Sequence, residues 1–171
     1  MKLHSELTIN GKTYQKGDTV PWYTVYPFFL VHMGAFGLSG FYMAYADDGA
    51  PLHFLYLHGG FACFIYLIFY LAIFGPDRVR WMLINAGLGL FGIYAQIGWI
   101  LSWFGKEVSD FSAWVHAIPF FYYVLYTFLI HQMVLDLTRS REDPARRQLI
   151  DTLYIVLSVL IYGWLWMRGP A

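Results

Sequence analysis

Histidines are the residues of this 171-residue chain that could carry cofactor or proton chemistry. An ionisable side chain inside a membrane span is costly, and it marks a functional site by default. Imidazole is also a common ligand of haem iron. One cysteine, Cys63, allows neither an internal disulfide nor a cluster of thiolate ligands. The histidines that fall inside long apolar segments are His32, His53, His58, His116 and His131.

Composition and charge place these histidines in a membrane protein. The chain is 58% hydrophobic and only 13% charged, whereas a soluble domain is about 25% charged. Its 11 basic and 11 acidic residues cancel, which argues against a nucleic-acid partner. The apolar runs are near the roughly 20 residues that cross a bilayer. We therefore expect an all-α integral membrane protein, a bundle of five transmembrane helices with spans at about 23–46, 50–74, 81–104, 111–137 and 152–168.

Residues 1–22 are expected to form a short cap before the transmembrane domain of residues 23–171. Asn10-Gly11 favours a type I′ turn, and the flanking residues 7–9 and 13–15 fit the strands of a β-hairpin. Near the other end of the chain, Asp143 is a good helix N-cap and Pro144 a good first helical residue. A helix is therefore predicted to begin there, ahead of the last span.

The distribution of basic residues predicts the orientation. With five spans, one side of the membrane would hold Lys106 and Arg168, and the other side, with the N-terminus, would hold nine basic residues. Cytoplasmic loops carry the excess of lysine and arginine. We expect a multi-pass protein of a bacterial inner membrane, with the N-terminus and the cap in the cytoplasm and the C-terminus opposite. The nine residues are Lys2, Lys12, Lys16, Arg78, Arg80, Arg139, Arg141, Arg146 and Arg147.

Helical rise then gives each histidine a depth. His32 and His131 fall at similar depths in the cytoplasmic half, and His58 and His116 fall in the outer half, with His53 nearer the surface. His116 and His131 are 15 residues apart in the sequence, which is about 22 Å along a helix with a net rotation of about 60°. The sequence thus predicts one histidine pair in each half: His32 with His131, and His58, or alternatively His53, with His116.

This pattern resembles the general plan of membrane b-type cytochromes. In that plan, histidines on transmembrane helices hold two haems, and glycines on neighbouring helices let the rings approach. Here Gly34, Gly37 and Gly40 form one row, and a second row runs from Ala86 to Gly98 at three-residue intervals. The resemblance implies haem b, up to two groups, with His32, His58, His116 and His131 as iron ligands and His53 as an alternative outer ligand. The second span departs from the plan because it has no inner histidine.

Three functions remain open from the sequence. The first is a haem-bearing electron-transfer subunit of an oxidoreductase, linked to a quinone or to a partner, with Pro119 kinking the helix beside His116. The second is a non-redox accessory or scaffold subunit, whose histidines bond between helices. The third is a small transporter or proton channel with a histidine relay. Asn85 and Gln96 are expected to bond neighbouring helices. We expect the protein to be surrounded by lipid and to form a homo-oligomer or part of a larger membrane complex.

Overall fold

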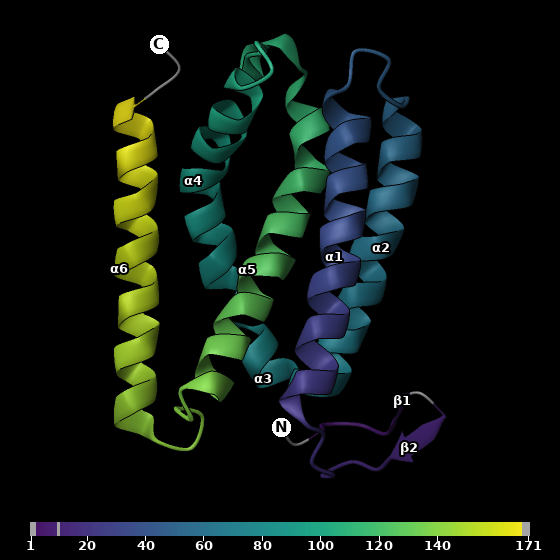
Figure 1. Cartoon of the computed structure of the whole chain (residues 1–171), viewed down its shortest axis with the longest axis vertical. Helices are drawn as coiled ribbons and strands as arrows, with labels where there is room; N and C mark the ends of the chain where they lie inside the picture. Colours follow the sequence, from purple (N-terminus) through teal and green to yellow (C-terminus); the bar gives the residue numbers. More distant parts are fainter. Residues whose placement is uncertain (1–2, 10, 169–171) are drawn as a thin grey trace.

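The computed structural model describes residues 3–9 and 11–168, and it shows a helical bundle with a small β-hairpin at one end (Figure 1). Successive long helices run in opposite directions, so the two ends of the chain lie at opposite ends of the bundle. Two 3₁₀ turns, η1 (Val108–Asp110) and η2 (Ala113–His116), connect α4 to α5. The helices are α1 (Trp22–Tyr45), α2 (Leu52–Phe74), α3 (Pro76–Val79), α4 (Met82–Ser102), α5 (Ala117–Leu137) and α6 (Pro144–Arg168).

Within residues 3–9 and 11–168, five helical segments are long and apolar enough to cross a membrane. They correspond to the five predicted spans, and the all-helical prediction is confirmed. The fourth α-helix starts later than the predicted span, because residues 113–116 form a 3₁₀ turn and the α-helix begins only at Ala117. Pro119 is therefore in the first turn of α5, where a missing N–H removes no bond from the helix interior. It helps to begin α5 and gives no reason for a kink.

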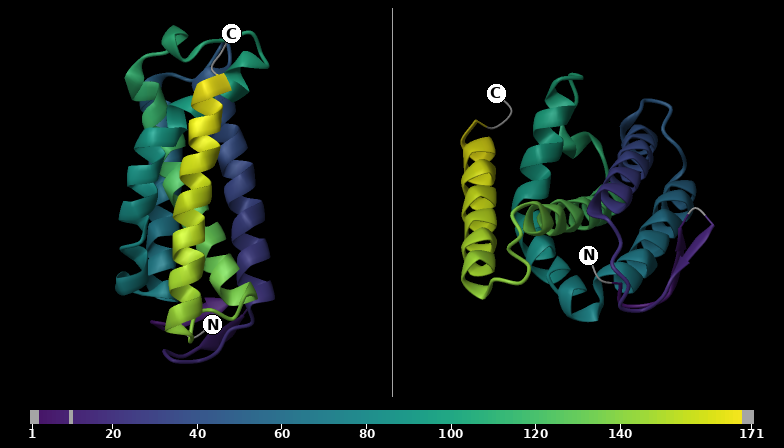
Figure 2. Two further views of the ribbon diagram at one scale, coloured as in Figure 1. Left: turned by 90° about the vertical axis from the view of Figure 1, so that its left-hand side faces the viewer. Right: turned by 60° about the horizontal axis from the view of Figure 1, so that its bottom comes forward.

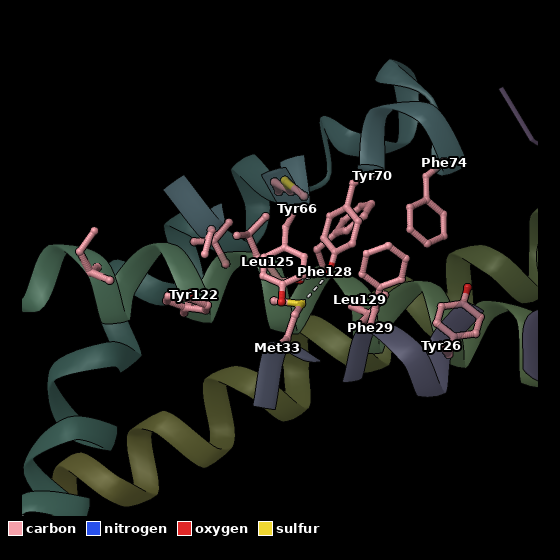
Figure 3. Close-up of a cluster of buried hydrophobic side chains, with 14 of the residues drawn as sticks. Tyr26, Phe29, Met33, Tyr66, Tyr70, Phe74, Tyr122, Leu125, Phe128 and Leu129 are labelled. Atoms are coloured by element: carbon pink, nitrogen blue, oxygen red, sulfur yellow. Dashed lines mark hydrogen bonds between the residues drawn. The ribbon is translucent and has the colours of Figure 1, made fainter. Parts of the chain in front are cut away.

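Helix α5 lies at the centre of the bundle, in contact with α1, α2 and α4 and along one edge with α6 (Figure 2). Aromatic side chains fill the space between α1, α2 and α5 (Figure 3). Within this cluster, the Tyr70 hydroxyl donates to Met33 Sδ at 2.8 Å. Helix α6 packs mainly on α4, and most of its surface is exposed.

The predicted hairpin is present, with β1 (Leu7–Ile9) antiparallel to β2 (Lys12–Tyr14). The second strand begins one residue earlier than expected, and Asn10, in the predicted turn, lies outside the described residues. The segment before β1 is tied to the end of α2, because the Ser5 amide donates to the Ala72 carbonyl at 3.1 Å. Gly75 then ends α2 with a φ of 82°, a conformation that favours glycine.

The two glycine rows have different surroundings. A Cβ on Gly89 would lie 2.8 Å from the Tyr123 ring, and one on Gly92 would lie 2.5 Å from the Tyr162 ring. These glycines of α4 thus allow close packing of α5 and α6. Around Gly34 and Gly37 of α1, by contrast, no atom lies within 4 Å of an added Cβ. Gly34 and Gly37 therefore face open space, whereas a Cβ on Gly40, the third residue of the row, would lie 3.8 Å from the Tyr122 ring.

Candidate functional site

A buried histidine–carboxylate pair joins α5 to α6. His131 is only 1% exposed, and its Nε2 lies 2.8 Å from Asp151 Oδ1. The imidazole is stacked on the indole of Trp81, with centroids 4.5 Å apart and ring planes 10° from parallel. Asp151 is 19% exposed, and Arg147 Nε lies 3.7 Å from its second oxygen. Two ionisable side chains, one on α5 and one on α6, are therefore in direct contact inside the bundle.

Arg141 and Gln132 determine which nitrogen of His131 carries the proton. Arg141 Nη1 donates to Gln132 Oε1 at 2.8 Å, so the amide oxygen faces the guanidinium. The amide NH₂ then faces His131 Nδ1, at 3.3 Å. Because an NH₂ can only donate, Nδ1 must accept. The network thus assigns neutral His131 the tautomer in which Nε2–H donates to Asp151.

Arg141 also connects this pair to α1. Its Nη2 donates to Asp136 Oδ2 at 2.7 Å, and its Nε donates to the other oxygen of the same carboxylate. The Tyr26 hydroxyl of α1 donates to Asp136 as well. Burial opposes the charge of Arg141, but the hydrogen bond and the charge of Asp136 outweigh it and raise the pKa of Arg141. A continuous set of hydrogen bonds therefore runs from α1 through α5 to α6.

A cavity of about 460 Å³ gives Asp151 access to the end of the bundle. Arg141, Arg147 and Gln148 line it together with Asp151 and Trp81. The pair thus has one member, Asp151, at the wall of an open cavity lined by both polar and apolar side chains, and the other member, His131, does not line it. Such an arrangement permits proton exchange between the outside of the bundle and a buried imidazole.

Further polar groups continue inward from His131. On α5, Thr127 and Tyr123 follow at intervals of four residues, so they share a face with His131, and the Tyr123 hydroxyl is hydrogen-bonded to that of Tyr162. On α4, one turn beyond Trp81, Asn85 is fully buried. Neither amide atom of Asn85 has a partner among the described residues, so the expected bond to a neighbouring helix is absent.

His116 lies at the opposite end of α5 in a separate cluster. Its Nδ1 is 2.8 Å from the Tyr45 hydroxyl of α1, and its ring contacts that of Tyr94 of α4. Lys106 donates to the Tyr45 carbonyl at 2.7 Å and pairs with Asp47 at 2.6 Å. These contacts join the α1–α2 turn to the segment that precedes α5.

His32 and His58 share a groove between α1 and α2. The groove has a volume of about 550 Å³, and aromatic side chains make up most of its wall. His32 Nδ1 is 2.8 Å from the Phe28 carbonyl, so it donates, and Nε2 keeps its lone pair. His58 Nε2 is 3.3 Å from the Ser39 hydroxyl. Because Ser39 is seven residues after His32, the two histidines are separated by about 10 Å along the helix axis.

Neither predicted histidine pair is in contact. His131 is bonded to Asp151, and His116 is bonded to Tyr45. Both nitrogens of His131 have partners, so it does not fit as an iron ligand in this arrangement. His53 is exposed in the first turn of α2. Among the described residues, no group of three or more His, Cys, Asp or Glu side chains could hold a metal ion.

Asp151 is the functional candidate that sequence reasoning missed. The last membrane span was predicted from Thr152, so Asp151 was assigned to the charged helical segment ahead of that span, whereas the observed structure has one continuous helix from Pro144 to Arg168. A helix drawn from the predicted N-cap Asp143 would have placed Asp151, Tyr154 and Tyr162 on one face, at helical spacing. The contact of that face with His131 could not be found from the sequence, because helical spacing does not identify the neighbouring helix.

Comparison with known proteins adds no functional assignment. No protein-family model matches the chain, and neither a curated protein nor a solved structure matches it.

Proposed function

We propose that the chain is a multi-pass inner-membrane protein that moves protons through the His131–Asp151 pair, either as a small proton-coupled transporter or as a proton-conducting subunit. The observation that carries the proposal is a buried imidazole bonded to a carboxylate that lines an open cavity together with Arg141 and Arg147. Ionisable groups within membrane spans commonly serve as proton relays. Histidine suits this role because its unperturbed pKa is about 6.5.

The basic residues support a cytoplasmic position for this cavity. The hairpin, α3 and the α5–α6 loop lie at one end of the bundle (Figure 1). These segments contain the described basic residues that the predicted topology places on the same side as the N-terminus. The connection between α4 and α5, which contains Lys106, and the last turn of α6, which ends at Arg168, lie at the other end (Figure 1). By the positive-inside tendency, protons would exchange between His131 and the cytoplasm.

The two nitrogens of His131 provide the relay. When a hydronium ion inside the bundle gives up a proton, its O–H bond breaks and an Nδ1–H bond forms; the Nε2–H bond then breaks, and that proton passes to Asp151 Oδ1. Water in the cavity then takes the proton from Asp151. The same steps in reverse carry a proton inward. In the imidazolium form, Trp81 stacking and the Asp151 charge both stabilise the cation.

Proton arrival at Nδ1 would also disturb the link to α1. An Nδ1–H faces the NH₂ of Gln132, so two donors meet until the amide rotates. Rotation turns Gln132 Oε1 toward His131 and away from Arg141. The hydrogen bond that Arg141 Nη1 donates to Gln132 Oε1, at 2.8 Å when His131 is neutral, would then be lost. Because Arg141 also holds Asp136 and Tyr26, protonation of His131 would be coupled to the contact between α5 and α1. A coupled transporter needs such a connection between proton binding and helix contacts.

Proton flux into liposomes tests this proposal. The wild-type protein, reconstituted with a pH-sensitive dye inside the vesicles and driven by a potassium diffusion potential, should acidify the lumen. His131→Gln should abolish the flux, and so should Asp151→Asn, which keeps the side-chain shape. His53→Gln is the matched control, because His53 is exposed and outside the network. Absence of flux in the wild type, or unchanged flux in both His131→Gln and Asp151→Asn, would overturn the proposal and favour a scaffold role.

Haem-linked electron transfer is a second candidate, supported by one observation at His32. Donation of Nδ1–H to a backbone carbonyl leaves Nε2 as the lone-pair nitrogen, which is the arrangement found in metal-bound histidines. The aromatic groove beside His32 could surround one flat ring. A haem b held there would supply one-electron chemistry. Expression with ample haem should give a Soret band that His32→Ala removes and His53→Ala keeps; a protein without a Soret band would refute this candidate.

A further inference from the structure

Asn85 of α4 is fully buried, and both polar atoms of its side chain lack a partner. It is 0% exposed, and neither the amide oxygen nor the amide nitrogen makes a hydrogen bond among the described residues. An unpaired amide in a protein interior is destabilising, whereas a leucine of similar volume would leave no polar atom there. Ordered water commonly satisfies such groups, and a buried water makes about three hydrogen bonds. Asn85 therefore points to a small polar ligand inside the bundle.

Two contacts fix how α4 and α5 pair on either side of Asn85. The two helices are antiparallel (Figure 1). Toward the hairpin end of the bundle, the indole of Trp81 is stacked on the imidazole of His131. About two turns further inward, a Cβ on Gly89 would lie 2.8 Å from the Tyr123 ring. The two contacts are eight residues apart on each helix, so the pairing stays in step between them.

This pairing places Asn85 opposite Thr127, halfway between the two contacts. The Thr127 hydroxyl donates to the Tyr123 carbonyl at 2.7 Å, so its oxygen can still accept. Tyr154 of α6, whose ring centroid is 5.0 Å from that of His131, interacts with Thr127. Asn85 bonds neither hydroxyl. Three helices therefore bring an amide and two hydroxyls to one level of the bundle, without a direct bond from the amide to either hydroxyl.

We propose that Asn85 holds a buried water molecule, and that this water carries the proton on the inner side of His131. One water can accept from the Asn85 NH₂, donate to its carbonyl oxygen and donate to the Thr127 oxygen. Four residues of helix, about 6 Å, separate this level from His131. A second water with two hydrogen bonds of about 2.8 Å each spans that distance. The water site depends only on the unpartnered amide, whereas its part in proton movement rests on the proposed function.

Asn85 is a positioning residue in this scheme, because its amide takes up no proton. A proton that binds to the water at Asn85 makes a hydronium ion, whose O–H groups donate to Asn85 Oδ1 and to Thr127. One O–H bond of that hydronium then breaks, and the proton joins the second water. The second water becomes the hydronium that protonates His131 Nδ1, and neutral water remains at Asn85.

Solid-state NMR of the protein in bilayers tests for water at Asn85. Asn10 and Asn85 are the only asparagines of the sequence, so ¹⁵N-labelled asparagine gives two side-chain amide signals. Asn10→Ser removes one of them and thereby identifies that of Asn85. Magnetisation that starts on water protons should reach the Asn85 amide nitrogen, although the side chain is fully buried. An Asn85 amide that receives none would overturn the inference.

Proton flux in the liposome assay tests the role of this water. Asn85→Leu should lose proton flux, and Asn85→Ser, whose hydroxyl can bind water, should recover part of it. Gln96→Leu is the matched control, because it makes a similar change about three turns away on α4, and it should conduct as the wild type does. Unchanged flux in Asn85→Leu, or an equal loss in Gln96→Leu, would overturn the role in proton movement. Water contact at Asn85 in a wild type that carries no protons would refute the proposed function and support the water site.

Discussion

Replacement of Arg141 by methionine should strongly destabilise the bundle. The Arg141 and Asp136 side chains are each 12% exposed, and Arg141 also bonds Gln132 and Tyr26. Removal of one member of a buried ion pair leaves an uncompensated charge and costs about 3–5 kcal/mol. Arg141→Met should therefore lower the free energy of unfolding by about that amount. Arg141→Lys should restore only part of this lost stability, because lysine cannot make the bidentate hydrogen bond to the Asp136 carboxylate.

The assay is reversible unfolding in mixed micelles with increasing SDS, followed by circular dichroism. The double variant Asp136→Leu with Arg141→Met should be more stable than Arg141→Met alone, because it leaves no buried charge. Arg80→Met is the control: its partner Asp77 is 3.8 Å away, both side chains are largely exposed, and little change is expected. Equal stability of Arg141→Met and Arg80→Met, or a double variant no better than the sum of its single changes, would refute the reasoning.

The pH dependence of this ion pair follows from Arg141. Because Asp136 raises the pKa of Arg141 in the folded protein, the stability from the arginine charge is complete below the pKa of the unfolded chain. This stabilisation is lost only when the pH rises through the higher pKa that Arg141 has in the folded protein. Alkaline conditions short of that range should leave the contribution of Arg141 unchanged.

Three other variants test the packing and the cluster at the far end of α5. Gly92→Ala should cost about 1–3 kcal/mol in the same unfolding assay, because its Cβ would lie 2.5 Å from the Tyr162 ring. Gly34→Ala, in open space, should cost nothing, and equal losses for both would contradict the packing described. Tyr45→Phe should cost about 1–3 kcal/mol, since buried His116 Nδ1 would lose its partner; wild-type stability would show that water can replace the hydroxyl.

The sequence predicted the elements well because local signals determine them. Apolar runs gave the five helices, Asn10-Gly11 gave the hairpin, and Asp143 with Pro144 gave the start of α6, where the Arg146 amide donates to Asp143 Oδ1 at 3.1 Å. Gly75 likewise marked the end of α2. Each of these signals depends on neighbours within a few residues.

The histidine pairs could not be predicted, because depth along a helix does not determine the direction of a side chain. His32 and His131 were assigned similar depths, yet His32 faces the α1–α2 groove and His131 faces Trp81 and α6. The 60° rotation estimated for His116 and His131 is consistent with their positions, since both rings contact residues at or near α4. The order of helices around α5 decided the partners, and no local pattern encodes that order.

The protonation of His131 itself tests the central claim most directly. Nitrogen NMR of ¹⁵N-histidine-labelled protein in bilayers distinguishes the two neutral tautomers and the imidazolium, and His131→Gln identifies the signal. The proton-relay account predicts neutral His131 with the proton on Nε2 at high pH, and conversion to imidazolium as the pH falls while the protein stays folded. A neutral form protonated on Nδ1, or a ring that never takes up a second proton in the folded state, would contradict it.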